Sequence, residues 1–357
     1  MDSLKKNKKA LSVNELRTGM IIAEKVYSEQ TVLINRGVVV TETIINRLKD
    51  KFIFENIEVF TEEDGKIDFL ELVKEKTVEE IEQTFKQLSF NVEIMFESIS
   101  IKGITDLEEV QQFAKKIQGE LNSPRTIIKD IVLQGSGNDV IYRHSVNVAA
   151  LSSILGKWLG FDNEKISDLI CCAILHDFGK TKIDKNVLEA SGDLSADISN
   201  EMRSHPLLGF NILKVIPNLK DSIAEGVLSH HERLDGSGYP KGLKDDRINA
   251  FARIIAIADT FDEVNSTRLY SVARGPFQGL EFIQQQSFGK LDYEYSKVFL
   301  EHVINFYISE NVLLTNKKIA KIIQIDINDL ERPLLLDDQG FVDLKKQSNI
   351  SIAKLLL

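Results

Sequence analysis

The sequence predicts a mainly α-helical protein in which a helical bundle carries the functional site. A small β-rich module precedes this bundle at the N-terminus, and a short β element follows it at the C-terminus. Residues 136–300 form a succession of amphipathic helical patterns, separated by loops that contain Gly and Asp. Short β-like runs fill residues 11–60 and return after residue 308. A length of 357 residues is enough for two or three such parts.

The N-terminal part is predicted to be a β-rich module over residues 1–62, with a candidate sensory or regulatory role. Its β-like runs are 19–26 and 31–40, and a helical pattern follows near 42–48. An acidic stretch that contains a glycine, residues 62–66, then marks a boundary.

Two long helix-like segments, about 68–97 and 105–133, form a region of linking helices over residues 66–134. These helices either pair with a second copy of the chain, which would give a homodimer, or pack on the helical core. The sequence favours neither alternative.

The rest of the chain divides into a central helical domain, residues 135–305, and a C-terminal β element, residues 308–357. The β element is predicted from the apolar runs 312–314, 319–325 and 333–336.

Composition and charge restrict the function. No apolar run approaches the ~20 residues that span a bilayer, and residues 1–9 lack the apolar stretch of a secretory signal. A soluble, cytoplasmic protein without a membrane span is therefore expected. A net charge of −10 argues against binding long nucleic acid, although local charges could still hold a small anion. The neighbours Cys171 and Cys172 are expected to be reduced core residues, because a strain-free disulfide between adjacent cysteines is not expected.

The histidines are unevenly distributed. Of six in the chain, five lie within 88 consecutive residues, where an even spread would place one or two. These five are His144, His176, His205, His230 and His231. A single histidine on an apolar helix face is usually a core residue, but five together indicate a binding site.

Helical spacing places several of these histidines on buried faces. His144 precedes a stripe of apolar residues at steps of four and three, so its ring starts from the inward side of a helix. His205 has the same pattern, and Pro206 predicts that its helix begins there. Apolar residues also lead at helical spacing to His230 and His231, so at least one of that pair is expected to be buried.

Two aspartates accompany the histidines. His176 and Asp177 follow an apolar helical pattern, and Gly179 indicates where that helix stops. Asp259 ends the nearly continuous apolar run 251–259, where a carboxylate is costly to bury without a cationic partner. The combination predicts a metal centre. Imidazole and carboxylate ligands suit Fe, Mn, Zn, Co or Ni, and the ligand types do not choose among these metals.

Two motifs carry a resemblance to a known family. Residues 176–180 read His-Asp-Phe-Gly-Lys, and residues 230–240 read His-His-Glu-Arg-Leu-Asp-Gly-Ser-Gly-Tyr-Pro. This pattern resembles the HD-GYP family, bacterial cyclic di-GMP phosphodiesterases within the HD phosphohydrolase superfamily, and the resemblance extends over about residues 142–270. It implies an HD-type helical bundle. It also implies hydrolysis of cyclic di-GMP to linear pGpG, with onward cleavage to GMP as a further outcome, through a hydroxide that two metal ions activate.

The resemblance also implies metal ligands and a catalytic pair. His144, His176, Asp177 and Asp259 would hold one divalent ion, and Asp177 would bridge to a second ion held by His205, His230 and His231. Fe or Mn would be the expected metals. Lys180 would reach the attacked phosphate and stabilise the negative charge that develops there, so Asp177 and Lys180 would be the catalytic residues.

Substrate contacts are implied in the same way. The loop residues Gly238, Tyr239 and Pro240 would wall the pocket, with the tyrosine offering a hydroxyl or a ring. Arg268 would clamp a phosphate, because a guanidinium binds oxyanions in a fork.

The chain departs from the family pattern at two positions. Family members with a third metal carry a glutamate four residues before the first histidine, but here Val140 stands there and Asp139 is one residue off, which predicts a two-metal centre. Ser271 replaces a basic residue of the family, and this replacement bears on substrate affinity more than on metal chemistry.

Three other functions are compatible with these residues. The same metal site could hydrolyse another cyclic nucleotide. It could instead belong to an inactive or weakly active receptor, which binds the dinucleotide and signals through the linking helices to a partner protein. A di-iron oxygenase would use the same types of ligand.

Overall fold

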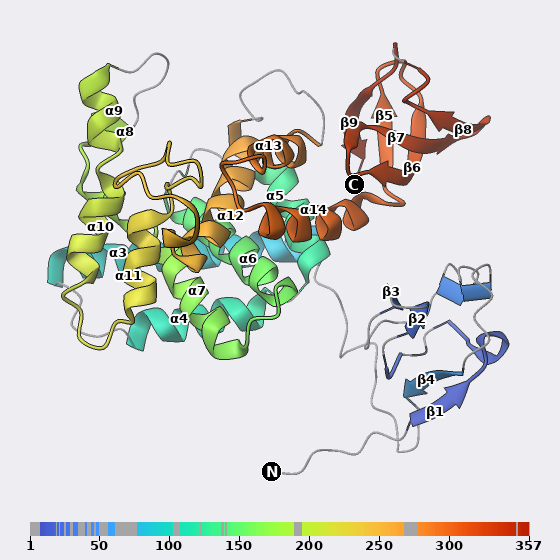
Figure 1. Cartoon of the computed structure of the whole chain (residues 1–357), viewed down its shortest axis with the longest axis horizontal. Helices are drawn as coiled ribbons and strands as arrows, with labels where there is room; N and C mark the ends of the chain where they lie inside the picture. The colour runs from blue at the N-terminus through green and yellow to red at the C-terminus, as the bar shows by residue number, and fades with distance from the viewer. Residues whose placement is uncertain are drawn as a thin grey trace. The chain divides into compact units, whose positions relative to one another are not determined.

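The computed structural model of the chain comprises two compact units, residues 1–74 and 75–357 (Figure 1). Each unit buries an apolar cluster of its own. The residues that the structure describes are 8–18, 20, 22–24, 26–28, 31–34, 40, 44–45, 48–49, 56–60, 77–102, 108–121, 123–136, 139, 141–188, 195–267, 277–347 and 349–356.

The N-terminal unit contains two antiparallel strand pairs. β1 (Lys8–Leu11) pairs with β4 (Ile57–Phe60), and β2 (Val26–Ser28) pairs with β3 (Thr31–Ile34). A short 3-10 helix, η1 (Val13–Glu15), follows β1. The β character predicted for this part of the chain is confirmed.

The core of the N-terminal unit joins these strands to the segment that was predicted to be helical near 42–48. Residues 44–45 and 48–49 are helical, and Leu48 is buried together with Ile22 and Val40. Burial of these apolar side chains is the main driving force available to so small a unit.

The larger unit is a bundle of helices followed by one β-sheet (Figure 1). Its helices are α3 (Val78–Lys102), α4 (Glu108–Glu120), α5 (Pro124–Gln134), α6 (Tyr142–Trp158), α7 (Asn163–Leu175), η2 (Phe178–Lys182), α8 (Lys185–Leu188), α9 (Ala196–Met202), α10 (His205–Leu213), α11 (Asp221–Ser229), η3 (Asp245–Arg247), α12 (Ala250–Thr267), α13 (Gln278–Gln286) and α14 (Tyr293–Tyr307). α6 packs against α3, α7 and α12. The predicted mainly α fold is confirmed.

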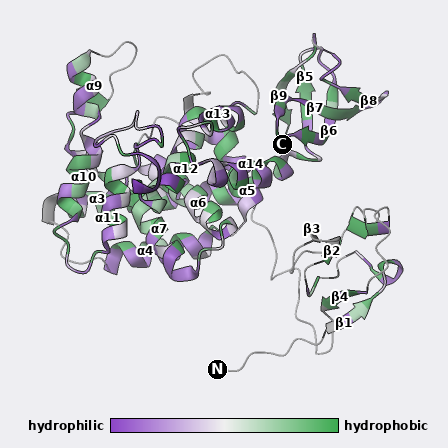
Figure 2. Ribbon diagram, in the orientation of Figure 1, coloured by the Kyte–Doolittle hydropathy of each residue, from purple (hydrophilic) through white to green (hydrophobic). Residues whose placement is uncertain are grey.

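Amphipathic patterning explains this packing. The helices of the bundle carry both hydrophobic and hydrophilic residues, as Figure 2 shows. In α3, Ile81, Phe85 and Leu88 recur at helical spacing and are almost completely buried. α6 is buried along most of its length, and it therefore provides a rigid base for the residues that project from it.

The segment 105–133, predicted as one helix, forms two helices instead. α4 ends at Glu120 and α5 begins at Pro124, which has no backbone N–H to donate and therefore occurs at the start of helices. α3 packs on α5 and α6, and α4 packs on α7. Packing within the chain, one of the two alternatives for this region, therefore occurs in the structure.

The C-terminal sheet is antiparallel, with the strand order β8-β7-β6-β5-β9. Its strands are β5 (Asn311–Leu314), β6 (Ile319–Asp326), β7 (Asp329–Asp337), β8 (Gly340–Asp343) and β9 (Ile352–Leu356). The predicted runs fall in β5, β6 and β7. β8 and β9 were not predicted, and β8 has only four residues, none of them fully buried.

Two expectations from composition bear on the described helices. None of those helices is both long enough and apolar enough to cross a membrane. Cys171 and Cys172 are buried free thiols in α7, as predicted, and burial raises the pKa of Cys171 to about 12.

Candidate metal centre

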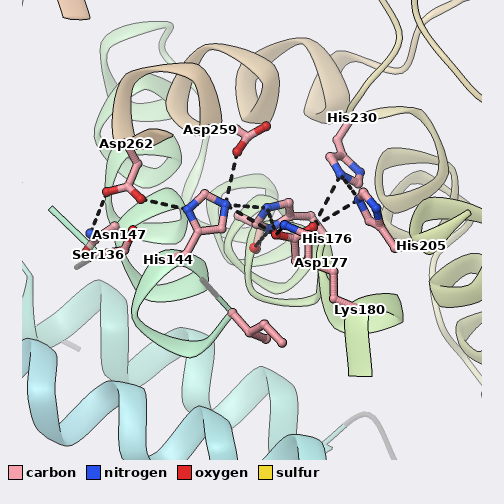
Figure 3. Close-up of polar contacts among 12 residues, drawn as sticks. Ser136, His144, Asn147, His176, Asp177, Lys180, His205, His230, Asp259 and Asp262 are labelled. Carbon is pink, nitrogen blue, oxygen red and sulfur yellow. Dashed lines mark hydrogen bonds and ion pairs between the residues drawn. The ribbon is translucent and has the colours of Figure 1, made fainter. Parts of the chain in front are cut away.

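The seven side chains predicted as metal ligands come together in the helical unit. All of them except His231 are labelled in Figure 3. They form two adjoining groups, within each of which the candidate ligand atoms lie within 4.8 Å of one another. The first group, called cluster A below, is His144, His176 and Asp259. The second, cluster B, is Asp177, His205, His230 and His231.

Helix ends position most of these residues. α7 ends one residue before His176, α10 begins at His205, and α11 ends one residue before His230. His144 lies in the first turn of α6, and Asp259 lies within α12. The predicted helix start at His205 and the burial of Asp259 are confirmed.

Three of the histidines are oriented by the same local contact. The Nδ1 atoms of His176, His205 and His230 each lie 2.7 Å from the carbonyl oxygen of the residue three positions earlier. Each carbonyl belongs to the last turn of a helix, where carbonyl groups have no intrahelical partner. A carbonyl oxygen can only accept a hydrogen bond, so Nδ1–H donates and the Nε2 atom is left with its lone pair.

These Nε2 atoms face one another across the site. The Nε2 atoms of His144 and His176 are 3.3 Å apart, and those of His205 and His230 are 3.2 Å apart. In the His205 and His230 pair both Nδ1 atoms donate to carbonyl oxygens, so the two Nε2 lone pairs point at one another and repel. A divalent cation bound by these Nε2 atoms would remove this repulsion, and the hydrogen bonds at Nδ1 would hold the rings in the orientation that binds it.

Asp177 contacts both clusters. Its Oδ2 atom lies 3.4 Å from the Nε2 atoms of His144 and His176, whereas its Oδ1 atom lies 3.1 Å from the Nε2 atom of His205. Asp177 Oδ1 and Asp259 Oδ2 are buried, and neither accepts a hydrogen bond from the described residues. Buried carboxylate oxygens in this state are costly, so the residues present fit metal ions.

Electrostatics keep four of the candidate ligands in the forms that bind metal. Burial lowers the pKa of His230 and of His231 well below the usual value, so both rings are neutral near pH 7. Burial alone would raise the pKa of Asp177, but Lys180 and His176 hold it well below its usual range. Burial alone would raise the pKa of Asp259 too, but the hydrogen bond from His144 and the nearby histidines together lower it.

Gly179 allows two elements of the site to approach closely. A Cβ atom at Gly179 would lie 2.0 Å from the carbonyl oxygen of His205, and a side chain there would force η2 and α10 apart. The glycine was interpreted as a helix stop, but α7 ends earlier, and Gly179 lies within η2. Its position is explained by this contact with the backbone of His205.

Lys180 lies next to the clusters. Its Nζ atom is 2.5 Å from Asp177 Oδ2, and its side chain is 15% exposed, so it lies between the buried clusters and the solvent.

The loop after His231 covers cluster B. The ring of Tyr239 stacks on the imidazole of His231, with centroids 4.7 Å apart. A Cβ atom at Gly238 would lie 2.4 Å from the backbone nitrogen of Arg233, so the loop needs a glycine there. Pro240 follows Tyr239 through a cis peptide bond and is exposed.

Several residues named from sequence lie elsewhere or outside the described part. The carboxylate of Asp139 accepts hydrogen bonds from the backbone N–H groups of Tyr142 and Arg143, so it caps the start of α6. Arg268, Val140 and Ser271 lie outside the described residues.

Two residues of the site were not identified from sequence. Glu232 is buried, and its two carboxylate oxygens accept backbone hydrogen bonds from Lys241 and Leu243, which fixes the loop that carries Tyr239. Asp262 is fully buried on α12, and its Oδ2 atom lies 2.8 Å from the Nδ1 atom of His144. Asp262 follows Asp259 by three positions, a helical spacing that places both carboxylates on one face.

The helical fold and the two His/Asp clusters define a helical protein with side chains that could hold metal ions. Residues 128–294, a little under half of the chain, match the model of the HD domain family. The resemblance based on residues 176–180 and 230–240 is thereby confirmed.

Curated relatives match only part of the chain. The cyclic di-GMP phosphodiesterase response regulator RpfG of Xanthomonas campestris is 39% identical over 34% of this chain and 33% of its own length. The 3'3'-cGAMP-specific phosphodiesterase 1 of Vibrio cholerae is 30% identical over 46% of this chain and 38% of its own. The chain therefore spans about a third of the length of these relatives.

Among solved structures, one with a similar fold is Bd1817, described as an HDG"Y"P protein from Bdellovibrio bacteriovorus, with 17% sequence identity and a TM-score of 0.53. The likeness covers 83% of this chain and 99% of the other chain.

Proposed function

We propose that the protein is a metal-dependent phosphodiesterase that hydrolyses cyclic di-GMP to linear pGpG, with onward cleavage to GMP as a second step. The observation that carries this proposal is the convergence of five histidines and two aspartates as clusters A and B, with imidazole Nε2 atoms facing one another. The names of the relatives, which act on cyclic dinucleotides, support the choice of substrate.

The residues present suit two divalent ions, with Fe or Mn as the proposed metals. Cluster A would hold one ion and cluster B the other, and each oxygen of Asp177 faces one cluster. Two such ions supply Lewis acidity, which generates a hydroxide nucleophile at neutral pH and stabilises charge on the phosphoryl group.

The side chains around the clusters have separate tasks in this proposal. Asp177 and Asp259 stay ionised, and His230 and His231 stay neutral, so these four residues need not lose a proton before they bind metal. Lys180 is close enough to Asp177 to place its ammonium beside a phosphate bound there, where it would stabilise the developing negative charge.

The loop around Tyr239 suits the organic part of a dinucleotide. Tyr239 already stacks on His231, so its other face and its hydroxyl are candidates for contact with a base or a phosphate. Gly238, Pro240 and Arg268 complete the proposed substrate contacts. A cytoplasmic location and a homodimer remain proposals as well.

The test is metal analysis of protein purified without oxygen, combined with a turnover assay. We expect about two Fe or Mn ions per chain, conversion of cyclic di-GMP to pGpG, and loss of turnover after chelation that added Mn²⁺ reverses. Asp177→Asn should abolish turnover. Asp184→Asn, an exposed aspartate seven positions further on, is the matched control and should retain it. Fully folded protein that binds no metal under these conditions would refute the proposal.

A second candidate substrate follows from one of the relatives. Because the Vibrio cholerae relative is named a 3'3'-cGAMP-specific phosphodiesterase, hydrolysis of that dinucleotide is the alternative. A comparison of kcat/KM for cyclic di-GMP, 3'3'-cGAMP and 3',5'-cyclic GMP distinguishes the candidates. A preference for 3'3'-cGAMP of more than about tenfold, or about 1.4 kcal/mol, would reassign the substrate and keep the metal chemistry.

A further inference from the structure

His144 differs from the other oriented histidines of the site in the partner of its Nδ1 atom. The carbonyl of Ile141, three residues earlier, already accepts the backbone N–H of Ser145, because His144 lies at the start of a helix. The partner is instead the carboxylate of Asp262, 2.8 Å away (Figure 3). This carboxylate is an acceptor, so Nδ1–H donates and Nε2 is directed toward Asp259, at 3.1 Å.

The second oxygen of Asp262 is also engaged. The Nδ2 atom of Asn147 donates to Asp262 Oδ1 at 2.6 Å, and the Oδ1 atom of Asn147 accepts from Arg143 Nε at 2.9 Å. Asn147 and Asp262 are fully buried. Since both ends of the amide are used, Asn147 can adopt only one orientation without leaving a buried group unpaired.

Arg143 continues these contacts to two other helices. Its guanidinium binds Asp130 of α5, with 2.7 Å between Nη2 and Oδ2, and Glu82 of α3, with 2.8 Å between Nη1 and Oε2. It also lies over the ring of Phe85, 4.3 Å from the centroid. The contacts therefore run without a break from His144 in cluster A to α3.

We propose that Asp262 is a positioning residue for His144, and that Asn147 and Arg143 extend its hydrogen bonds to α3, so that metal binding at cluster A and the packing of α3 are coupled. This inference rests on the proposed metal site. The coupling bears on function because α3 is the first described helix after the N-terminal unit along the chain. Coupling of this kind is reciprocal, since a change that displaces α3 would weaken metal binding by the same factor.

The first test uses a reversal of donor and acceptor. In Asp262→Asn the new amide has one acceptor, although His144 and Asn147 both donate to this position, so one of them loses its partner. In the double variant Asp262→Asn with Asn147→Asp, the pattern is restored, because the amide at 262 donates to the carboxylate at 147 and accepts from His144. Mn²⁺ affinity and stoichiometry are measured by calorimetry, and the paired or single-ion state by electron paramagnetic resonance.

We expect Asp262→Asn to bind Mn²⁺ about 10- to 100-fold more weakly at one of two sites, and the spectrum to change from that of a coupled pair to that of a single ion. The double variant should recover most of this loss. Unchanged Mn²⁺ binding by folded Asp262→Asn, or a folded double variant no better than the single one, would overturn the inference. Wild-type protein that binds no Mn²⁺ would refute the proposed function and this inference with it. If the wild type binds two Mn²⁺ ions and folded Asp262→Asn binds them equally well, the inference is refuted and the proposed function is not.

The second test concerns α3. In the wild type, Mn²⁺ should slow hydrogen–deuterium exchange in residues 78–102, and Arg143→Met should remove this effect while keeping the contact with Phe85. Lys86→Met is the matched control, since Lys86 contacts the same Glu82 but lies on the surface. If Arg143→Met does not fold, Glu82→Gln breaks only the last contact and should reduce the effect. If Mn²⁺ slowed exchange in residues 78–102 equally in the wild type and in the folded Arg143→Met or Glu82→Gln variant, the coupling would be overturned.

Discussion

His176 and Asp177 are neighbours in the chain, yet they belong to different clusters. The Nε2 atom of His176 faces that of His144 at 3.3 Å, whereas Asp177 Oδ1 faces His205 Nε2 at 3.1 Å. This is possible because α7 ends at Leu175, and the backbone then turns into η2. A single helix end thus supplies one side chain to each half of the site.

Substitutions of Asp177 and of Asp259 should therefore differ in how much metal the protein loses. Asp177→Asn should reduce occupancy at both clusters, because one oxygen of Asp177 faces each of them, and should leave well under one Mn²⁺ per chain. Asp259→Asn should affect only cluster A and leave about one ion. Metal analysis after reconstitution and desalting measures both variants. Equal loss in the two would contradict the bridging position of Asp177.

Gly179 should be intolerant of any side chain. Gly179→Ala places a Cβ atom 2.0 Å from the carbonyl oxygen of His205, so η2 and α10 must separate. We expect a loss of about 2 kcal/mol or more in the free energy of unfolding, together with weaker metal binding at cluster B.

The matched control for this change is Gly119→Ala in α4. A Cβ atom at that position meets no atom within 4 Å, and alanine favours the helix, so the protein should gain about 0.5 kcal/mol. Denaturant unfolding of both variants gives the comparison. A neutral Gly179→Ala would show that the approach of η2 to α10 can relax without cost.

Much of the candidate site was predictable from sequence, because its information is local. The apolar spacing after His205 and before His230 determines which helix face is buried, and the 176–180 motif is a continuous stretch of chain. Asp259 was predictable for the same reason, as a carboxylate within an apolar helix. Local patterns of this type are retained in the fold, since burying an apolar face is what drives the helices together.

The contacts that orient these residues were not predictable, because they join distant parts of the chain. Asp262 meets His144 across 118 positions, and the carbonyl contact that requires Gly179 comes from a different helix. No periodicity in either segment encodes such a pair. The division of 105–133 into two helices was overlooked for another reason: apolar spacing continues through Pro124, although the residue itself begins a new helix.

Lys180 should contribute to turnover and not to metal content. Lys180→Gln removes the ammonium next to Asp177 but leaves every candidate ligand, so we expect about two ions per chain and kcat reduced by about 100-fold. Lys182→Gln, two residues further along η2 and exposed, should be close to the wild type. Steady-state kinetics on metal-analysed protein provide the measurement. If Lys180→Gln lost its metal, the lysine would instead act by keeping the carboxylate of Asp177 in place.

The two clusters should respond differently to pH. In cluster A, burial opposes protonation of His144, but hydrogen bonds from its ring to Asp259 and Asp262 raise its pKa well above the ordinary 6.5. Near neutral pH the metal-free ring therefore holds a proton that a metal must displace. Affinity at cluster A should increase about tenfold per pH unit until the pH passes the pKa of His144.

In cluster B the pKa shifts have the opposite sign, because burial lowers the pKa of His230 and of His231 well below 6.5. Both rings are already neutral above that pH, so they release no proton when metal binds, and affinity should change little as the pH rises. Mn²⁺ calorimetry between about pH 6.5 and 8, repeated in buffers of different ionisation enthalpy, counts the protons released at each step. We expect the Mn²⁺ affinity of one site to rise steeply with pH and that of the other site to stay nearly constant. Two parallel dependences would mean that His144 holds no proton in the metal-free protein, and that Asp262 orients the ring without charging it.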